Sequence, residues 1–524
     1  MKLRKSMLFA LIAVASTSLT ACRSKSKSDV LFWSSFGSRY RLILDDITAD
    51  MSNELGINIE HISKGSYDGI LTEMQNALGT QKFPGIAVGY PDHFAYYHGS
   101  DILRPLDSYA SSLLSDYDPD YLPENYLHER DGSSHLYGVP FNKSTELLGY
   151  NGVFVDYCVF KTGDESLRVL PETWEEWANI EDPNSKVSKY MSVFNELIST
   201  KAVIYATQDT KGKASDFSTT QGAGQVKVFD YTKADPNQTR LLTWDATDNA
   251  FITLVRQWGG KYTELPTDQY SVNPLRRRGK VLFASETNLP KTIAMLKVMN
   301  KMARSRVFGV PENVGGTFSS DAFSEGRVMF MVCSSGGLSY NTSNWENRFS
   351  VAPIPYHDAS LKYVISQGAN LCMTTNGDAD KNFEVIKALT TGKYQTQWAI
   401  ETGYFPASNS AADTPEYQAF LNGTSYDNKT IVTYREGAKV NENEYRGKAH
   451  AGEVGYKPWV RFVDDAFIGS SVVRTVVKDV LPFVIKYCVE NIDDDAGYIA
   501  QIKKIIQDER ISNNINISVD TNLN

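Results

Sequence analysis

The sequence predicts an α/β protein with at least two domains. Its 524 residues exceed what a single hydrophobic core usually organises, and 42% apolar and 22% charged residues are typical of a globular chain. The first third alternates short apolar runs with segments whose apolar residues recur at helical spacing. This alternation is typical of parallel strands connected by helices.

The first predicted unit is a strand, a helix and a second strand. Residues 30–33 form a short apolar run, and residues 40–55 have apolar side chains at every third or fourth position, which predicts a helix. Gly56 marks the end of that helix, because glycine readily adopts the left-handed conformation found at helix ends. The isoleucines of residues 57–62 then begin the second strand.

The same pattern continues towards the middle of the chain. Residues 66–80 have the spacing of another helix that ends at a glycine, and residues 83–90 are predicted as a third buried strand. Thr173 and Glu176 have the spacing of a capping box, so we expect a helix to begin there. Residues 205–243 are polar and rich in glycine, threonine and lysine, which we interpret as a long surface insertion.

The second half of the chain is also predicted to mix helices and strands. Helices are expected over 251–258, in the first part of 383–410 and over 464–507. Strands are expected in 321–335 after Gly326, and over 348–356. The last residues, 511–524, are polar and are expected to be disordered.

The N-terminus predicts export and a lipid anchor. A positively charged start precedes the apolar run 7–15, which is too short for a permanent membrane span. The sequence Leu-Thr-Ala-Cys that ends at Cys22 resembles a bacterial lipobox, so we expect residues 1–21 to be removed and Cys22 to be diacylated. Residues 22–29 then form a polar tether that holds the protein outside the cytoplasmic membrane.

Composition and motifs exclude several other classes of protein. The net charge of −9 argues against general nucleic-acid binding, and no second apolar run is long enough to span a membrane. The sequence has no P-loop, GxSxG or HExxH motif, so we expect no catalytic residue, metal or cofactor. The hypothesis of a glycosidase with paired carboxylates stays open, because carboxylates are plentiful.

Four cysteines follow Cys22, namely Cys158, Cys333, Cys372 and Cys488. They are expected to be small buried residues or, alternatively, to form one or two disulfides.

Polar or aromatic residues follow six of the predicted apolar strands. They occur in FWSSFG (32–37), VGYPDHF (88–94), PFNKST (140–145), CSSGGLSY (333–340), SQGANL (366–371) and ETGYFPAS (401–408). Ligands of open α/β sheets bind beyond the carboxyl ends of strands, so six such strand ends predict one ligand cleft.

These segments resemble the family 1 extracellular solute-binding proteins of ABC importers, and within them the sn-glycerol-3-phosphate-binding group. The resemblance is carried, in the order typical of the family, by FWSSFG (32–37), KGSYDGIL (64–71), PFNKSTELLGYN (140–151), FSEGRVMFMVCSSGGL (323–338), ETGYFPASNSAA (401–412) and KPWVRFVDDAF (457–467).

The resemblance implies a two-lobed, type II periplasmic-binding-protein fold that closes on a ligand about a hinge. Lobe 1 is expected to comprise residues 30–140 plus 350–395, and lobe 2 residues 141–349 plus 396–510. Strands that cross between the lobes are expected near 138–145, 350–355 and 393–400.

The resemblance also implies ligand-binding residues. Ser144 is expected to hydrogen-bond the ligand, whereas Ser334, Ser335 and the Gly336 amide are expected to form a small cradle for an anion or a hydroxyl. For each of these residues the alternative is a purely structural role in a turn or loop.

Five further residues complete the expected site. Tyr67 and Tyr404 would pack on a polyol, Gly368 would let the backbone approach the ligand, Asp92 would accept from ligand hydroxyls, and Arg461 would bind a phosphate. The alternatives are a core position for each tyrosine and a surface salt bridge for the arginine.

One region departs from the family pattern. Residues 197–250 lack the expected Thr/Ser-Gly-Trp contact, and Asp248 and Asn249 are candidates to replace its hydrogen bonds. Trp33 and Trp258 are expected in the core, with sugar stacking as the alternative.

The implied function is that of a lipid-anchored, monomeric receptor that delivers a solute to the permease subunits of an ABC importer. The expected ligand is a glycerol phosphate, a glycerophosphodiester or, alternatively, an oligosaccharide. A secreted glycosidase and an adhesin-like surface protein are the competing hypotheses.

Overall fold

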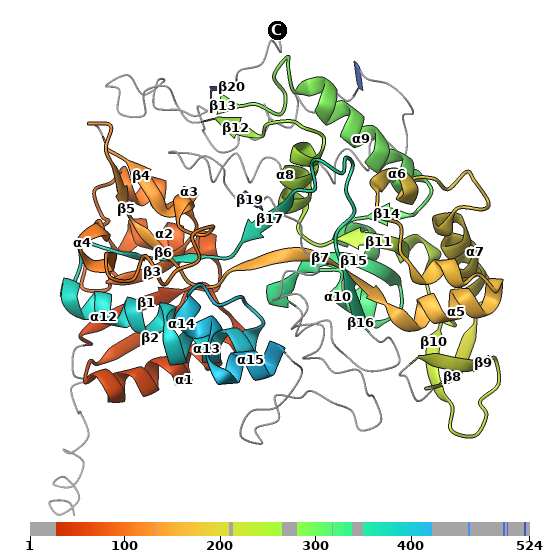
Figure 1. The fold of residues 1–524 in the computed structure, drawn as a ribbon, viewed down its shortest axis with the longest axis horizontal. Coiled ribbons are helices and arrows are strands. Elements are labelled where there is room, and N and C mark those ends of the chain that lie inside the picture. Colours follow the sequence, from red (N-terminus) through yellow and green to blue (C-terminus); the bar gives the residue numbers. More distant parts are fainter. Residues whose placement is uncertain are drawn as a thin grey trace, which may run out of the picture.

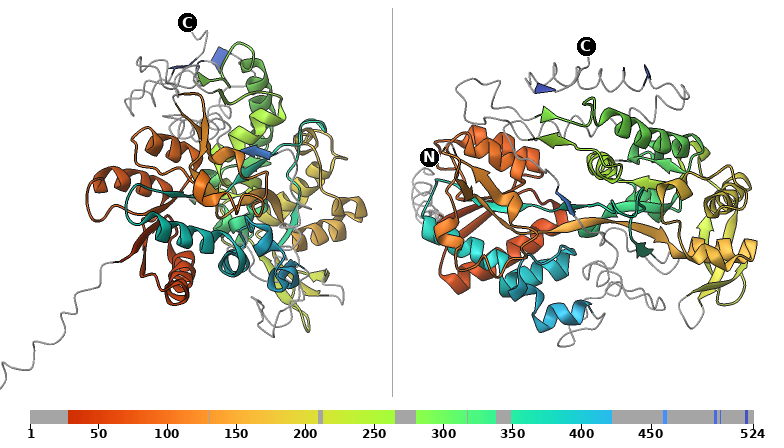
Figure 2. Two further views of the ribbon diagram at one scale, coloured as in Figure 1. Left: turned by 60° about the vertical axis from the view of Figure 1, so that its left-hand side comes forward. Right: turned by 45° about the horizontal axis from the view of Figure 1, so that its top comes forward.

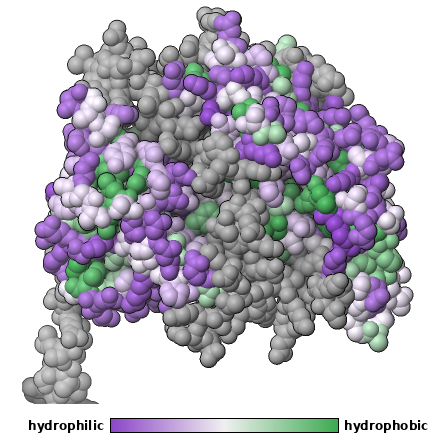
Figure 3. All heavy atoms as spheres, viewed as in Figure 1, coloured by the Kyte–Doolittle hydropathy of each residue, from purple (hydrophilic) through white to green (hydrophobic). Residues whose placement is uncertain are grey.

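The computed structural model describes residues 28–129, 131–208, 213–264, 280–316, 318–337, 349–421, 459–461, 496–497, 500 and 518–519. Within these residues the chain forms two α/β lobes, each with its own sheet and its own hydrophobic core (Figure 1). Hydrophilic residues cover most of the outer faces of both lobes in the view of Figure 3. The predicted α/β, two-lobed fold is therefore confirmed.

The first lobe is built on a five-stranded sheet. Its order is β2 (Ile59–Ser63), β1 (Val30–Ser34), β3 (Ile86–Gly89), β18 (Asn370–Met373) and β6 (Gly138–Pro140). The first three strands are parallel, as predicted, and β18 runs antiparallel to both of its neighbours. A strand from late in the chain thus completes the sheet that the first strands begin.

Helices cover this sheet, and their ends follow local sequence signals. They are α1 (Ser38–Leu55), α2 (Tyr67–Ala77), α3 (Pro91–His98), α4 (Asp107–Ala110), α12 (Ala379–Thr390), α13 (Gly392–Thr402), α14 (Asn409–Ala412) and α15 (Pro415–Leu421), with a hairpin of β4 (Tyr126–His128) and β5 (Ser134–Leu136). Gly56 ends α1 at φ +65°, as predicted, and the Ser66 hydroxyl caps α2 by accepting from the Gly69 amide at 2.9 Å.

The second lobe is built on a larger mixed sheet. Its order is β14 (Phe308–Gly309), β11 (Arg240–Trp244), β15 (Val328–Ser334), β7 (Ser144–Asn151), β17 (Val364–Gln367) and β19 (Trp459–Arg461), and β16 (Phe349–Ala352) also pairs with β7. The strand predicted after Gly326 is β15, and it is almost entirely buried.

The helices of the second lobe are α5 (Gly152–Thr162), α6 (Trp174–Trp177), α7 (Lys186–Ser199), α8 (Thr247–Gln257), α9 (Leu289–Arg304) and α10 (Ser320–Ser324). Short 3-10 helices occur at Pro123–Asn125, Glu165–Arg168, Pro236–Gln238, Pro311–Val314 and Ser335–Gly337. The predicted capping box is present: the Glu176 amide donates to Thr173 Oγ1 at 3.1 Å, and the Thr173 amide donates to the Glu176 carboxylate at 3.2 Å.

The predicted surface insertion at residues 205–243 is corrected by the structure. This region contains a three-stranded sheet of β10 (Val226–Asp230), β8 (Val203–Gln208) and β9 (Ala214–Ser218), and it ends in the buried strand β11. Phe229 and Tyr231 belong to the core of the second lobe. The segment was misinterpreted because only one face of the small sheet is buried, so each strand has few apolar residues.

Two connections between the lobes are described. Residues 141–143 lead from β6 to β7, and residues 368–369 lead from β17 back to β18. They run side by side, because Thr145 pairs with Ser366 and Ser144 pairs with Gln367. Figure 2 (right) shows β7 extending between the lobes. The first connection coincides with the crossing predicted at 138–145.

The other two predicted crossings, and with them the lobe boundaries predicted after residue 350, are wrong. Residues 349–352 form β16, which pairs with β7 inside the second sheet, so the predicted crossing at 350–355 belongs to the second lobe. Residues 393–400 lie in α13, whose Trp398 packs in the core of the first lobe. The first lobe therefore includes residues 370–421, which contain α12 to α15.

The C-terminal predictions fall mostly outside the described residues. Of the predicted tail, only β20 (Ser518–Val519) forms a described strand, and it pairs with β13 (Lys280–Val281), which also pairs with β12 (Thr263–Glu264). Most of the predicted helix 464–507, as well as Cys22 and Cys488, lies outside the described part of the chain.

The three described cysteines, Cys158, Cys333 and Cys372, are free thiols in buried positions. In the part of the chain that the structure describes, no helix is long and apolar enough to cross a membrane. The same residues contain no group of three or more His, Cys, Asp or Glu side chains placed to hold a metal ion.

Candidate binding site

A cavity of about 800 Å³ lies where the two lobes face one another. The first lobe contributes Tyr40 from α1 and Tyr404 from the loop after α13. The second lobe contributes the remaining lining residues, namely Glu146, Asp245, Ala246, Thr247, Asp248, Pro311, Glu312, Gly316, Phe318, Ser320, Cys333, Ser334, Gly336 and Gly337. The volume is within the range of small-molecule sites.

The two tyrosines are fixed by aromatic packing and by contact with the opposite lobe. Tyr404 stacks on Trp398, with ring centroids 6.1 Å apart and planes 4° from parallel. The Tyr40 hydroxyl donates to the Gly336 carbonyl of the second lobe at 2.7 Å. A Cβ atom on Gly336 would lie 2.5 Å from the Tyr404 ring, so this close approach requires glycine. The position is thus a packing contact between the lobes.

The predicted cradle at the end of β15 is only partly realised. Ser334 and Gly336 line the cavity, but the Gly336 amide donates to the Ser334 hydroxyl at 3.1 Å. Ser335 is fully buried, and its hydroxyl accepts from the Thr145 amide at 3.1 Å, which ties β15 to β7. Ser335 therefore has a structural role.

Glu146 is the most buried carboxyl group of the cavity wall, with 1% of its surface exposed. Its Oε1 accepts from Asn249 Nδ2 at 3.0 Å, and the same nitrogen donates to Gln367 Oε1 at 2.7 Å. Burial raises the pKa of Glu146 to about 8, although hydrogen bonds from Asn249 and Trp244 favour the charged form. At neutral pH this group is therefore mainly a neutral carboxylic acid.

Two further carboxylates stand beside it, at the start of α8. Asp245 follows β11 directly, and its Oδ1 accepts from the Ser319 amide at 2.7 Å; burial raises the pKa of Asp245. Asp248 lies in the first turn of α8, where the positive end of the helix dipole favours a negative charge. Asp248 and Asn249 were predicted as hydrogen-bonding replacements, and the structure places Asp248 in the cavity wall and Asn249 behind it.

Phe318 is the exposed aromatic residue of the cavity. It follows a glycine-rich turn and has 62% of its surface exposed, whereas most phenylalanines of the chain are buried. A free ring face of this kind is suited to pack on the apolar face of a sugar ring. Sequence reasoning missed Phe318, and the available signal was the preceding Gly-Gly pair, which is typical of a loop.

Several predicted residues do not reach this cavity. Tyr67 packs edge-on against Tyr90, with centroids 4.7 Å apart, and contacts the cluster that contains Ile365 of β17. Asp92 is fully buried in the first turn of α3. Ser144 is buried in the pairing of β7 with β17. For these three residues, ligand contact stays a prediction.

The last two predicted residues lie at the crossing strands. Gly368 has φ +102°, and a Cβ atom there would lie 1.8 Å from the Asn142 carbonyl oxygen. The close approach that it permits is therefore to the other crossing segment rather than to a ligand. Arg461 ends β19 opposite Ser366 of β17. Its side chain is outside what the structure describes, so the phosphate contact stays a prediction.

A hydrogen-bonded chain of Ser34, His61 and Asp45 in the first lobe has the residue types of a nucleophilic triad. Ser34 Oγ lies 2.7 Å from His61 Nε2, and His61 Nδ1 lies 2.6 Å from Asp45 Oδ1. Ser34, however, is fully buried, so a substrate carbonyl cannot reach its hydroxyl. We interpret the chain as a structural link between β1, β2 and α1.

Stability is expected to fall at acidic pH because of His61. Burial lowers the pKa of His61, with hydrogen bonding to Asp45 acting in the opposite direction. The folded protein therefore disfavours the charged imidazole, whereas the unfolded chain binds a proton near pH 6.5. This contribution to stability is present above pH 6.5 and is lost as the pH falls below it. Thermal midpoints between pH 7.5 and 5.0 should show a decrease that His61→Gln reduces; an unchanged slope in the variant contradicts the assignment.

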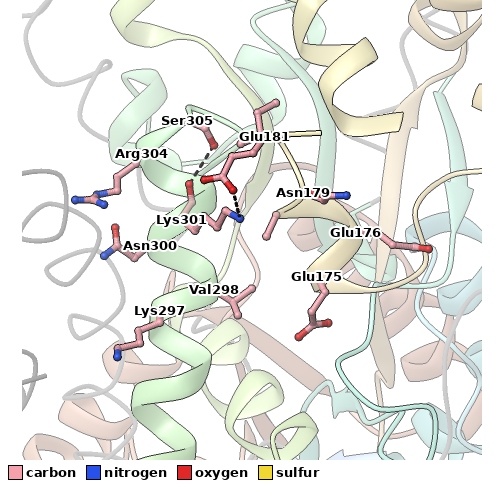
Figure 4. Close-up of a pocket in the computed structure, with 12 residues that line it drawn as sticks. Glu175, Glu176, Asn179, Glu181, Lys297, Val298, Asn300, Lys301, Arg304 and Ser305 are labelled. Carbon is pink, nitrogen blue, oxygen red and sulfur yellow. Dashed lines mark hydrogen bonds and ion pairs between the residues drawn. The ribbon is translucent and has the colours of Figure 1, made fainter. Parts of the chain in front are cut away.

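A second hollow, of about 1030 Å³, lies wholly on the second lobe between α9 and the segment that follows α6 (Figure 4). Lys301 of α9 pairs with Glu181 at 3.3 Å, and both side chains are largely exposed. Exposed pairs of this kind contribute little energy. The hollow has no residue from the first lobe, so lobe closure does not change it, and the cavity between the lobes is the better candidate.

Comparison with known proteins identifies the family. The sequence profile of the bacterial extracellular solute-binding proteins matches residues 46–421. The chain belongs to this family. Two curated relatives of this bacterial extracellular solute-binding protein are sn-glycerol-3-phosphate-binding periplasmic proteins UgpB. That of Yersinia enterocolitica is 24% identical over 78% of this chain and 81% of its own length, and that of Escherichia coli K12 is 23% identical over 68% and 69%.

Solved structures show the same two-lobed fold. UgpB of Mycobacterium tuberculosis in complex with glycerophosphocholine matches with a TM-score of 0.60 and 16% identity, over 93% of this chain and 99% of that one. The GacH receptor of Streptomyces glaucescens matches with a TM-score of 0.59 and 14% identity, over 92% and 97%. Maltose-bound MalE3 of T. maritima matches with a TM-score of 0.56 and 16% identity, over 92% and 99%.

Proposed function

We propose that this protein is the substrate-binding component of an ABC importer and captures a polar, carbohydrate-type solute for a membrane permease. The observation that carries the proposal is the cavity between the lobes, which combines two tyrosines of one lobe with carboxyl and hydroxyl groups of the other. A ligand that contacts both walls stabilises the closed arrangement, because only that arrangement brings the walls together. The relatives named for glycerol 3-phosphate, glycerophosphocholine, acarbose and maltose complexes support this class of ligand.

Two kinds of ligand within this class are candidates. An oligosaccharide is favoured by the exposed ring of Phe318 and by the hydrogen-bonding carboxyl groups. A glycerol phosphate or glycerophosphodiester is favoured by the names of the curated relatives and by the position of β19, which places Arg461 next to Ser366.

Anchoring and partnership are part of the same proposal. We infer that Cys22 carries the lipid, that residues 22–29 tether the lobes to the outer surface of the cytoplasmic membrane, and that the monomer docks on the permease subunits there. Two acyl chains suffice for stable anchoring, because each buried methylene contributes about 0.8 kcal/mol. Mass spectrometry of the membrane fraction tests the lipid, and Cys22→Ser should release the protein from the membrane.

A thermal-shift experiment tests ligand capture. The protein that begins at residue 23 is heated with sn-glycerol 3-phosphate, glycerophosphocholine, maltotriose and raffinose. A ligand at 100 times its Kd adds about 2.7 kcal/mol, which raises the midpoint of a lobe of 150–250 residues by about 5–10 °C. If none of these ligands shifts the midpoint and a chromogenic glycoside is hydrolysed, the binding-protein assignment is wrong and the glycosidase hypothesis gains support.

Replacing Phe318 with alanine should weaken saccharide binding about fivefold without lowering stability. The ring is largely exposed, so its removal costs little packing, whereas a stacked sugar loses about 1 kcal/mol of contact. Phe160→Ala is the matched control, because Phe160 is 56% exposed and lies on α5, outside the cavity lining. Isothermal titration gives both affinities; equal affinities for the two variants exclude the stacking role.

A further inference from the structure

The ionisable residues of the cavity wall are all acidic. Glu146, Asp245, Asp248 and Glu312 come from four places in the second lobe: β7, the end of β11, the first turn of α8 and the 3-10 helix Pro311–Val314. The described lining residues include no lysine, arginine or histidine. Glu146 is mainly neutral, so the negative potential of this wall comes from the other carboxylates, and a shielded, low-dielectric cavity strengthens it.

Three described groups of the kind that bind a phosphate are already engaged elsewhere. Lys143, the basic residue of the first crossing segment, is fully buried and donates to Glu124 at 2.6 Å and to the Gly368 carbonyl at 3.1 Å. Lys64, after β2, lies 3.8 Å from the centroid of the Trp33 ring. The Gly336 amide, the expected anion donor, is directed at Ser334.

Glu146 provides the second, independent observation. It lines the cavity and is almost fully buried, and its Oε2 makes no hydrogen bond of ordinary length and angle to a described residue, although the Trp244 indole also acts on this carboxyl group. Leaving a buried polar atom unsatisfied is costly, so such an atom in a cavity wall indicates a ligand group that completes its hydrogen bonding. A neutral carboxylic acid both donates and accepts, which matches a hydroxyl group.

We propose that the cavity selects a polyol without negative charge, whose hydroxyl groups donate to Glu146, Asp245 and Asp248, and that the acidic wall rejects phosphate-bearing ligands. This inference rests on the proposed function and names the ligand class of the same site. It separates this chain from the relatives named for sn-glycerol 3-phosphate, to which it is 22–24% identical over 78% of its length. The selection is electrostatic, because a phosphate would face the carboxylates that line the cavity.

Isothermal titration of the protein that begins at residue 23 tests the inference, with maltotriose and sn-glycerol 3-phosphate as probes. Maltotriose is expected to bind at least 100-fold more tightly than sn-glycerol 3-phosphate. Glu312→Lys should raise the affinity for sn-glycerol 3-phosphate about tenfold, because it replaces an exposed carboxylate of the wall with a cation. The fold of this variant should be unaffected, since Glu312 is exposed.

Glu384→Lys is the matched control, because it changes the net charge equally on an exposed face of α12 in the first lobe. It should leave both affinities unchanged. Binding of sn-glycerol 3-phosphate by the unmodified protein as tight as that of maltotriose overturns this inference and leaves the proposed function intact. Equal gains in phosphate affinity for the two variants also overturn it, since net charge would then explain the effect. Absence of binding by any saccharide or phosphate ligand overturns the proposed function, and the inference with it.

Discussion

Gly368→Ala is expected to destabilise the protein by about 3–5 kcal/mol. Gly368 lies where the second crossing segment passes over the first, and its φ of +102° is strained for any residue with a Cβ atom. The added carbon would lie 1.8 Å from the Asn142 carbonyl oxygen and 2.7 Å from Lys143 Cα. Both are backbone atoms, so no side-chain rotation relieves the clash, and the two segments must separate.

Gly224→Ala separates backbone strain from this clash. Gly224 has φ +72°, and no other atom lies within 4 Å of the position that a Cβ would take, so alanine there should cost only about 1–2 kcal/mol. Thermal midpoints of the two variants are the measurement, and the difference should be several degrees. If Gly368→Ala is no less stable than Gly224→Ala, the crossing segments do not approach one another as described.

Local sequence signals were sufficient to predict the elements that open each lobe. Gly56 ends α1, and Thr173 with Glu176 begins α6, because caps depend on residues within one helical turn. The connection at 141–143 was also predictable, since an apolar strand there changes to polar residues and then becomes apolar again. Each of these features is decided by a few neighbouring residues.

Pairings between distant segments could not be predicted in this way. The strand at residues 349–352 was expected to cross between the lobes, but it pairs with β7, where Gly149 leaves room for the Phe349 ring. A Cβ atom on Gly149 would lie 2.4 Å from that ring. This fit joins residues 200 positions apart, and neither glycine nor phenylalanine alone indicates it.

The candidate site was predictable only in part for the same reason. Ser334, Gly336 and Tyr404 were predicted and do line the cavity. Glu146 lies within the family-like segment 140–151, but its apolar neighbours concealed its role, and burial is a property of the folded chain. Asp245 follows a strand end like the other six polar segments, and it was missed because that strand was interpreted as an insertion.

Lys143→Met is expected to cost about 3–5 kcal/mol, because it leaves the Glu124 carboxylate buried without its cation. The two side chains are 0% and 4% exposed and lie 2.6 Å apart. Asn370 Nδ2 also donates to Glu124 at 2.9 Å, but an amide offsets only part of a buried charge. Urea denaturation of the variant should show a clearly lower midpoint at an unchanged slope.

Lys161→Met is the matched control, since Lys161 pairs with Glu196 at 2.7 Å on the surface, where both side chains are substantially exposed. Its removal should change stability by no more than about 0.5 kcal/mol. The double variant Lys143→Met/Glu124→Gln should recover part of the loss, because the neutral amide needs no cation. A loss below about 1 kcal/mol for Lys143→Met would contradict a buried pair.

The buried pair also lies where the two lobes are connected. Lys143 joins the first crossing segment to Glu124 of the first lobe and to the Gly368 carbonyl of the second crossing. A weakened pair should therefore loosen the pivot about which the cavity closes, and ligand affinity should fall together with stability.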